Sequence, residues 1–166
     1  EKIPTLREVL ELTQGKILVN IEIKPTQYDN DIAGKVVALI EEYGMEDECE
    51  ITSFDYNALK QVKAYNKDIK TGYILSVAYG RFYDTDEVDF FSMNASFLSK
   101  RLIDAIHKSG KEVYAWTVNN EASIRNLSNK GVDNIITDRH VVAKETVLSR
   151  DTSETLVNMS RYVFNR

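Results

Sequence analysis

The sequence predicts an α/β protein, a (β/α)₈ TIM-type barrel that is incomplete within this chain. Short apolar runs rich in β-branched residues alternate with amphipathic helical patterns, and no tight hairpin signal lies between them. Repeated βα units of this kind favour a parallel sheet that closes into a barrel, which typically needs about 250 residues. The chain has 166 residues and six predicted strands, so we expect about six βα units, with the first two missing. An open doubly wound sheet is the alternative, because six strands can complete one.

The predicted elements follow one another along the chain. A helical pattern over Thr5–Leu12 comes first, with Thr5 placed to cap the helix ahead of Glu8. The predicted strands are Ile17–Lys24, Glu50–Phe54, Thr71–Ser76, Val88–Met93, Glu112–Val118 and Asn134–Thr137. Four apolar helical faces lie between them, formed by Ile32, Val36, Val37, Leu39, Ile40 and Tyr43, by Leu59, Val62 and Tyr65, by Leu98, Leu102, Ile103 and Ile106, and by Ile124 and Leu127. The places where helices should end carry Gly44, Gly110 and Gly131.

The two ends of the chain carry further predictions. We assign residues 1–150 to the barrel and residues 151–166 to a C-terminal helical extension. A helix from about Val141 to Leu148 follows the last strand. In the extension, Asp151 and Glu154 offer a second cap, and the apolar stripe consists of Leu156, Met159 and Val163. The chain starts at Glu1 without a methionine, which indicates a segment of a longer protein.

The composition excludes several classes of protein. Hydrophobic residues make up 43% and charged residues 28% of the chain, as in globular proteins, and this excludes intrinsic disorder. The net charge is −5 and no long basic run is present, so no nucleic-acid partner is expected. The single cysteine, Cys49, excludes an internal disulfide framework and a cysteine-based zinc cluster. No apolar run approaches the ~18 residues of a transmembrane helix; a membrane segment would lie outside this chain, and the compartment stays open.

The predicted first strand carries the strongest local signal. Side chains alternate across a strand. One face therefore carries Val19, Ile21 and Ile23, and the other carries Asn20, Glu22 and Lys24. In a barrel the outer face packs on helices, so the polar side chains should point inward, near the carboxyl end of the strand, where barrel active sites lie. The alternative is an edge strand whose polar face is solvated and has no function.

Four short motifs occur in a fixed order along the chain. They are Asn20-Ile21-Glu22-Ile23-Lys24-Pro25, Ile51-Thr52-Ser53-Phe54-Asp55, Gly110-Lys111-Glu112-Val113-Tyr114-Ala115-Trp116-Thr117-Val118-Asn119 and Gly131-Val132-Asp133-Asn134-Ile135-Ile136-Thr137-Asp138. Their order and spacing resemble those of the glycerophosphodiester phosphodiesterase family over about Ile3 to Leu148, with the first motif similar to its Glu-x-Lys strand. The fold of that family is a (β/α)₈ barrel, which agrees with the fold predicted from the strand and helix patterns.

The resemblance implies a metal-dependent phosphodiesterase that hydrolyses glycerophosphodiesters to glycerol 3-phosphate and an alcohol. In that family a divalent cation, Mg²⁺ or Ca²⁺, is held by carboxylates and binds the phosphate, and Glu22 matches one of these ligands. Lys24 matches the catalytic lysine that faces the phosphate, where an ammonium stabilises charge on phosphoryl oxygens. Trp116 matches a substrate-binding tryptophan near the glycerol end of the pocket. Phe54 and Asn94 are further candidates for the substrate-binding wall.

The chain also departs from the family pattern. The family opens with a His-Arg strand motif, followed by a Glu-x-Asp pair and a second histidine, and none of these occurs in the 166 residues. The two histidines that transfer protons and two of the three metal carboxylates are therefore absent, so the chain resembles the C-terminal part of the catalytic domain. His107 and His140 do not replace the missing pair by position. We expect the chain to be inactive alone.

Two alternatives remain open. Lys24 could be the Schiff-base lysine of an aldolase-type barrel, although Glu22, two residues away, favours the charged ammonium. The chain could also be a non-catalytic barrel remnant that acts as a binding or regulatory module. In each case the open sheet edges predict self-association or pairing with the missing N-terminal segment.

Overall fold

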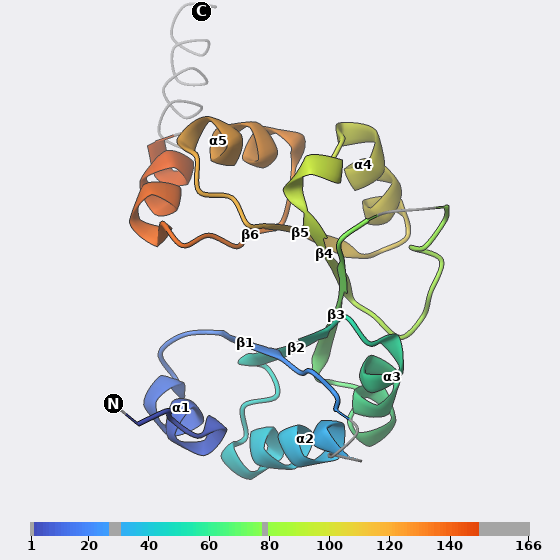
Figure 1. Ribbon diagram of the computed structural model, residues 1–166, viewed down its shortest axis with the longest axis vertical. Coiled ribbons are helices and arrows are strands. Elements are labelled where there is room, and N and C mark those ends of the chain that lie inside the picture. The colour runs from blue at the N-terminus through green and yellow to red at the C-terminus, as the bar shows by residue number, and fades with distance from the viewer. Residues whose placement is uncertain (1, 27–30, 78–79, 150–166) are drawn as a thin grey trace, which may run out of the picture.

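The computed structural model describes residues 2–26, 31–77 and 80–149 and contains one curled parallel sheet. The strands are β1 (Val19–Glu22), β2 (Cys49–Ser53), β3 (Lys70–Leu75), β4 (Phe90–Asn94), β5 (Glu112–Trp116) and β6 (Asn134–Ile135). Each strand pairs with its neighbour in sequence, in the order β1-β2-β3-β4-β5-β6. Seen along its axis, the sheet forms an open C with the helices on its outer side (Figure 1). The prediction of an incomplete barrel is confirmed, and the doubly wound alternative is wrong, because such a sheet reverses its strand order.

All six predicted strands are present, although some are shorter than predicted. β1 covers four residues of the predicted Ile17–Lys24, and β6 has only two residues. The ends of a strand depend on where its partner stops pairing, which the pattern along one segment does not show. The chain stays extended beyond β6, because Val118 N donates a hydrogen bond to Ile136 O at 3.0 Å.

The helices lie where the apolar patterns predict them. They are α1 (Leu6–Thr13), α2 (Ile32–Tyr43), α3 (Tyr56–Tyr65), α4 (Lys100–Lys108) and α5 (Glu121–Lys130), and residues 140–149 are also helical. The capping box is present, since the Thr5 side chain accepts from Glu8 N while the Glu8 carboxylate accepts from Thr5 N. Gly44 and Gly131 cap α2 and α5 with φ of 60° and 86°, a left-handed conformation that favours glycine. None of the described helices is long and apolar enough to cross a bilayer. The extension predicted for residues 151–166 lies outside the described residues.

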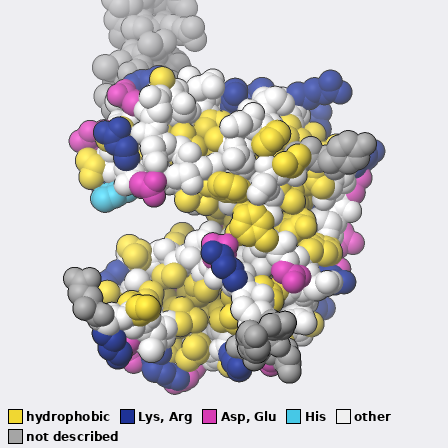
Figure 2. Space-filling model, viewed as in Figure 1, with side chains coloured by type: hydrophobic (Ala, Val, Ile, Leu, Met, Phe, Trp, Pro, Cys, Tyr) yellow, Lys and Arg dark blue, Asp and Glu magenta, His cyan; other side chains and the backbone are white. Residues whose placement is uncertain are grey.

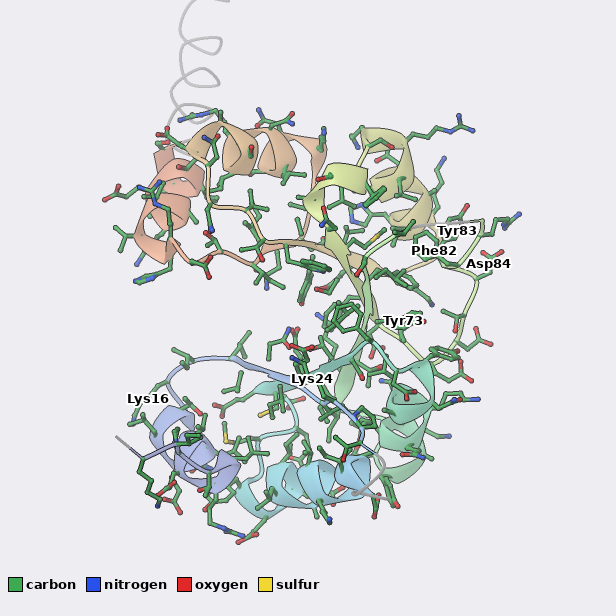
Figure 3. The ribbon with its side chains drawn as sticks, viewed as in Figure 1. Lys16, Lys24, Tyr73, Phe82, Tyr83 and Asp84 are labelled. Carbon is green, nitrogen blue, oxygen red and sulfur yellow. The ribbon has the colours of Figure 1, made fainter. Side chains whose placement is uncertain are left out.

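The connection between β3 and β4 has no helix in its described part. Aromatic side chains cover the outer face of the sheet there instead (Figure 3). Phe82 meets Phe91 of β4 edge-on, with ring centroids 5.0 Å apart, and Tyr83 meets Phe82 at 5.5 Å. Tyr73 of β3 packs on Tyr56 of α3 at 5.5 Å. These ring contacts take the place of the helix that covers the other units.

The alternation predicted for β1 places its side chains on two different surfaces of the sheet. The apolar set faces outward, where Ile23 is 2% exposed and Val19 and Ile21 pack against the core formed with the helices. The polar set, Asn20, Glu22 and Lys24, faces a cavity on the inner side. The candidate functional side chains of the β1 segment therefore lie on the inner surface of the curled sheet.

Candidate active site

A cavity of about 500 Å³ lies on the inner face of the sheet, towards the carboxyl ends of the strands. All six strands, or the residues directly after them, contribute to its lining, which consists of Asn20, Glu22, Lys24, Thr52, Phe54, Ile74, Ser92, Trp116, Thr117, Asn134 and Ile136. In the space-filling view the molecule is hollowed here, and the hollow opens to one side (Figure 2). The structure brings four predicted site residues together in this lining: Glu22, Lys24, Phe54 and Trp116.

Glu22 and Lys24 stand at the carboxyl end of β1 as an accessible ion pair. Lys24 Nζ lies 3.4 Å from Glu22 Oε1, and the two side chains are 74% and 37% exposed. The Lys24 side chain lies on the inner side of the curled sheet (Figure 3). Within the described residues neither group forms a second ion pair. We call these two residues the mouth pair; it offers one carboxylate and one ammonium to a ligand.

Two hydrogen bonds beside the mouth pair fix β1 against β2. Thr52 Oγ1 donates to Asn20 Oδ1 at 2.8 Å, and Ser53 Oγ donates to Ile23 O at 2.8 Å. Thr52 and Ser53 are 3% and 1% exposed; the bond from Ser53 to Ile23 O is buried, and the bond from Thr52 to Asn20 is partly buried. They hold the backbone that carries Glu22 and Lys24. Asn20 also lines the cavity, although it was not among the predicted site residues. Its place on the polar face of the strand was the signal that could have identified it.

Phe54 and Trp116 form an apolar wall of the cavity. Their rings meet edge-to-face, with centroids 6.3 Å apart and an interplanar angle of 78°. Phe54 keeps half of its surface exposed, and Ile74 and Ile136 add further apolar lining. The indole nitrogen of Trp116 is buried and has no hydrogen-bond partner within the described residues. The wall therefore offers a surface for the carbon skeleton of a ligand rather than for its charge.

Asn94, the fifth predicted site residue, is not among the residues that line the cavity. It ends β4, and its Oδ1 accepts from Ser96 N at 3.0 Å, which caps the short 3₁₀ helix Ala95–Phe97. A local backbone partner thus holds its amide oxygen. Its role in the wall stays a prediction.

Towards the amino ends of the strands, the inner face carries a second charged group of side chains. Lys70 Nζ donates to Glu112 Oε2 at 2.7 Å and to Tyr114 Oη at 3.1 Å, and it lies 3.2 Å from Glu50 Oε1. Tyr114 Oη donates to Glu50 Oε1 at 2.7 Å. Burial disfavours the charge of Lys70, but the hydrogen bonds with Glu112, Tyr114 and Glu50 outweigh it and raise the pKa of Lys70. We call these four residues the floor cluster; the sequence pattern did not identify it.

The cavity offers an incomplete set of metal ligands. Glu22 is the only carboxylate in its lining, and the described part of the chain contains no group of three or more His, Cys, Asp or Glu side chains that could hold a metal ion. A carboxylate oxygen suits Mg²⁺ or Ca²⁺, yet these cations take about six to eight oxygen ligands. Glu22 therefore fits as one ligand of a site that needs more.

The two histidines and the cysteine of the chain are not among the residues that line the cavity. His107 Nε2 lies 2.8 Å from Asp133 Oδ2 near the end of α4, and His140 begins the helix over residues 140–149. Cys49 is 2% exposed, and burial, followed by the charges of nearby glutamates, raises the pKa of its thiol to about 11. A thiol of this kind is a poor nucleophile at neutral pH. Neither histidine is among the residues that line the cavity, and the expectation that they do not replace the missing pair stays a prediction.

Comparison with known proteins agrees with the incomplete barrel in two respects, the fold and the share of each relative that this chain covers. The sequence matches the model of the glycerophosphoryl diester phosphodiesterase family over residues 1–142. A glycerophosphodiester phosphodiesterase from Caldanaerobacter subterraneus subsp. tengcongensis is 30% identical over 97% of this chain and 63% of its own length. Of the solved structures, a glycerophosphodiester phosphodiesterase from Parabacteroides distasonis has a TM-score of 0.80 at 18% identity, covering 91% of this chain and 66% of that one. An Oleispira antarctica phosphodiesterase in complex with the product sn-glycerol-3-phosphate has a TM-score of 0.73 at 24% identity, covering 87% and 61%. This chain spans less than two thirds of each of these relatives.

Proposed function

The chain belongs to the glycerophosphoryl diester phosphodiesterase family, and we propose that residues 1–150 are the C-terminal part of the catalytic barrel of such an enzyme. The whole enzyme hydrolyses a glycerophosphodiester to glycerol 3-phosphate and an alcohol, with the help of a divalent cation. The observation that carries this proposal is the mouth pair, a carboxylate and an ammonium 3.4 Å apart in a cavity that also contains Trp116. The relative that was solved with sn-glycerol-3-phosphate supports a small-molecule substrate of this class.

Lys24 has the role of stabilising charge on the phosphoryl group. Its ammonium is 74% exposed and tethered to the sheet by β1, so it can turn from Glu22 to a phosphate oxygen. A positioned cation is most useful where negative charge develops, here on the phosphoryl oxygens as water attacks phosphorus and the alcohol oxygen leaves. The Schiff-base alternative requires a lysine in a desolvated or cationic environment. The exposure of Lys24 and its pairing with Glu22 argue against that alternative.

Glu22 has the role of one oxygen ligand to Mg²⁺ or Ca²⁺. The cation, when bound, supplies positive charge to the phosphate oxygens and orients the substrate. Since Glu22 is the only carboxylate in the cavity lining, the other ligands have to be supplied by groups that do not line this cavity. We therefore expect the isolated chain to bind the cation weakly.

Trp116 and Phe54 have the role of holding the carbon skeleton of the substrate. Their edge-to-face rings give the cavity an apolar side, which suits the CH and CH₂ groups of glycerol better than its phosphate. Asn94 can add to this wall through its amide nitrogen, while its oxygen accepts from Ser96 N.

The partner of this chain is a segment that supplies the missing strands together with the proton-transferring histidines. Within the described residues β1 and β6 have no strand on their outer edge, and exposed apolar side chains lie near them: Ile17 is 61% and Leu18 72% exposed just before β1, and Val141 is 55% exposed in the helix after β6. An open edge with exposed apolar side chains favours pairing with another strand. Self-association of two copies through these edges is the competing outcome, and it leaves the acid–base groups absent.

Reconstitution tests the proposal. We join the part of the Caldanaerobacter relative that precedes its match to this chain ahead of Glu1, and we measure metal-dependent release of glycerol 3-phosphate from glycerophosphocholine. The isolated chain should show no release, because each missing proton transfer is worth about 10²–10⁴ in rate. In the chimera, Glu22→Ala and Lys24→Ala should each lower the rate by about 10²-fold or more, whereas His107→Ala should not change it. A folded, inactive chimera, or turnover by the isolated chain that depends on His107 or His140, would contradict the proposal.

A further inference from the structure

The edge strand β6 has a short backbone ladder to the rest of the sheet, and side chains beyond its end add to it. The ladder between β5 and β6 has only two positions, whereas that between β1 and β2 has four. Past the ladder, Asn119 Oδ1 accepts from Thr137 Oγ1 and from Asp138 N, both at 2.9 Å, and Asn119 Nδ2 donates to Asp138 Oδ2 at 2.7 Å. We call Asn119, Thr137 and Asp138 the rim latch. It joins the segment after β5 to the segment after β6.

The rim latch lies directly behind one wall of the cavity. Trp116 and Thr117 line the cavity just before Asn119, and Ile136 lines it just before Thr137. β6 is an edge strand, so no strand on its other side within the described residues holds this wall in place. Without the latch, the two-position ladder remains, and the backbone bonds at this edge are those from Val118 N to Ile136 O, from Ile136 N to Ala115 O and from Asp133 N to Val113 O. Beyond the ladder the wall then keeps only the bond from Val118 N and a 3.5 Å contact between Arg139 Nη1 and Asn119 O, among the described residues. Few bonds and an open side are the conditions for local opening.

We propose that Asn119 is a positioning residue: through Thr137 and Asp138 it fixes the Trp116 wall of the cavity relative to β6. It does not touch the ligand itself. The link to ligand binding rests on the proposed function, whereas the effect on the wall does not.

Fluorescence tests the effect on the wall, because Trp116 is the only tryptophan of the chain. In Asn119→Ala, quenching of Trp116 by acrylamide should rise by about twofold or more, since the wall opens more often. Asn120→Ala is the matched control: it removes the neighbouring asparagine, whose Oδ1 caps α5 by accepting from Ser123 N at 3.2 Å, and leaves the rim latch intact. It should destabilise the chain without changing the quenching. Unchanged quenching in Asn119→Ala, or an equal rise in the control, overturns the proposal.

A polarity swap separates positioning from a general loss of stability. Asn119→Asp brings two carboxylates together and should open the wall. Adding Asp138→Asn restores the pair with its polarity reversed, because the amide at position 138 can donate to the carboxylate at position 119. That carboxylate can still accept from Thr137 Oγ1 and from the backbone N–H of residue 138. The double variant should return the quenching to the wild-type value. A double variant that is no better than Asn119→Asp alone overturns the proposal.

A titration with sn-glycerol 3-phosphate, followed through Trp116 fluorescence, tests the link to the ligand. If the phosphate binds the wild-type chain, Asn119→Ala should weaken its affinity and the double variant should restore it; an unchanged affinity in Asn119→Ala overturns this link. A wild-type chain that does not respond counts against a phosphate site formed by this chain alone, while reconstitution tests the proposed function and the quenching experiments decide the role of Asn119.

Discussion

The inner face of the sheet carries two groups in which a lysine meets glutamate, the floor cluster and the mouth pair, and they differ in how many bonds their members make. In the floor cluster, Lys70 contacts Glu50, Glu112 and Tyr114, and its ammonium lies 5.4 Å above the ring centroid of Phe90. In the mouth pair, one contact of 3.4 Å joins the two members, and both remain exposed to solvent. Only the second arrangement can exchange its partner for a ligand at small cost.

The difference separates a structural role from a functional one. Charged groups that are buried with all their partners resist change, because removal of one leaves the others uncompensated. Glu50, with 15% of its side chain exposed, and Tyr114, at 4%, are the most buried members of the floor cluster, whereas 43% of the Glu112 side chain is exposed and its charge is held by the bond with Lys70. Burial, together with the hydrogen bond to Glu50, raises the pKa of Tyr114, so it remains a donor to that carboxylate at all working pH values. The floor cluster is thus a bonded network near the amino ends of the strands, whereas the mouth pair can exchange its partner for a ligand.

The largest expected effect is that of Lys70→Met on stability. The substitution keeps an apolar stem on the rings of Phe90 and Tyr114 but leaves Glu50 and Glu112 without their cation. We expect a loss of about 2–3 kcal/mol in the free energy of unfolding, which is below the about 3–5 kcal/mol of a fully buried pair because a third of the Lys70 side chain is exposed. Urea unfolding followed by circular dichroism measures it.

A double variant sharpens this prediction. Adding Glu50→Gln removes the most buried uncompensated charge, so Lys70→Met with Glu50→Gln should be less destabilised than the sum of the two single variants. Additive losses would mean that the floor cluster is not one bonded unit, and the contrast with the mouth pair would then disappear.

The packing above the floor cluster gives the next largest effect. Phe90 stacks on Tyr114 with centroids 4.1 Å apart, and a Cβ added at Gly72 would lie 2.1 Å from the Phe90 ring. Gly72→Ala should therefore cost about 1–3 kcal/mol through overpacking. Phe90→Leu in the same chain should recover part of the loss, because the smaller side chain leaves space at residue 72. Thermal unfolding of the three variants would contradict this account if Gly72→Ala were as stable as the wild type.

Metal binding at the mouth pair gives a smaller effect. With one carboxylate in the cavity, a dissociation constant on the order of 10⁻³ M is expected for Mg²⁺ or Ca²⁺. At 10⁻² M cation this stabilises the folded chain by about 1.4 kcal/mol, and Glu22→Gln should abolish most of that gain. Unfolding with and without the cation measures it. A tight stoichiometric site that Glu22→Ala removes would show instead that further ligands, for example from a second copy of the chain, complete the site.

The fold was largely predictable because its signals are local and periodic. The period of two on β1 separated Ile23 from Glu22, and the period of 3.6 located the helices to within a few residues. The aromatic cover formed by Phe82 on Phe91 was not predictable, since residues in a loop have no period that shows which face they pack on. The length of β6 was not predictable either, because it depends on the pairing with β5.

The candidate site was predictable only where its residues belong to a motif. Glu22, Lys24, Phe54 and Trp116 were found in this way and line the cavity. The floor cluster was missed because its members come from three strands, with Tyr114 and Glu50 separated by 64 positions in sequence. Only the register of a parallel sheet brings such residues together. The available signal was the alternation within β2, β3 and β5, where a polar residue stands at a position that faces the inner side of the sheet.

The smallest expected effect is that of Lys24→Met on stability, and it is the direct counterpart of Lys70→Met. The same substitution removes the same charge from the same inner face. Lys24 makes one ion pair, at 3.4 Å, and 74% of its side chain is in solvent. Exposed pairs of this kind contribute about 0.2–1 kcal/mol, so the free energy of unfolding should fall by no more than about 0.5 kcal/mol.

Raising the salt concentration to about 1 M, where the Debye length is about 3 Å, should reduce even this difference, whereas the loss in Lys70→Met should persist because its cluster is less accessible to ions. Parallel urea titrations of the two variants at low and high salt decide the matter. Equal losses in both variants would make the mouth pair as structural as the floor cluster, and Lys24 would then be a poor choice for the residue that acts on the phosphate.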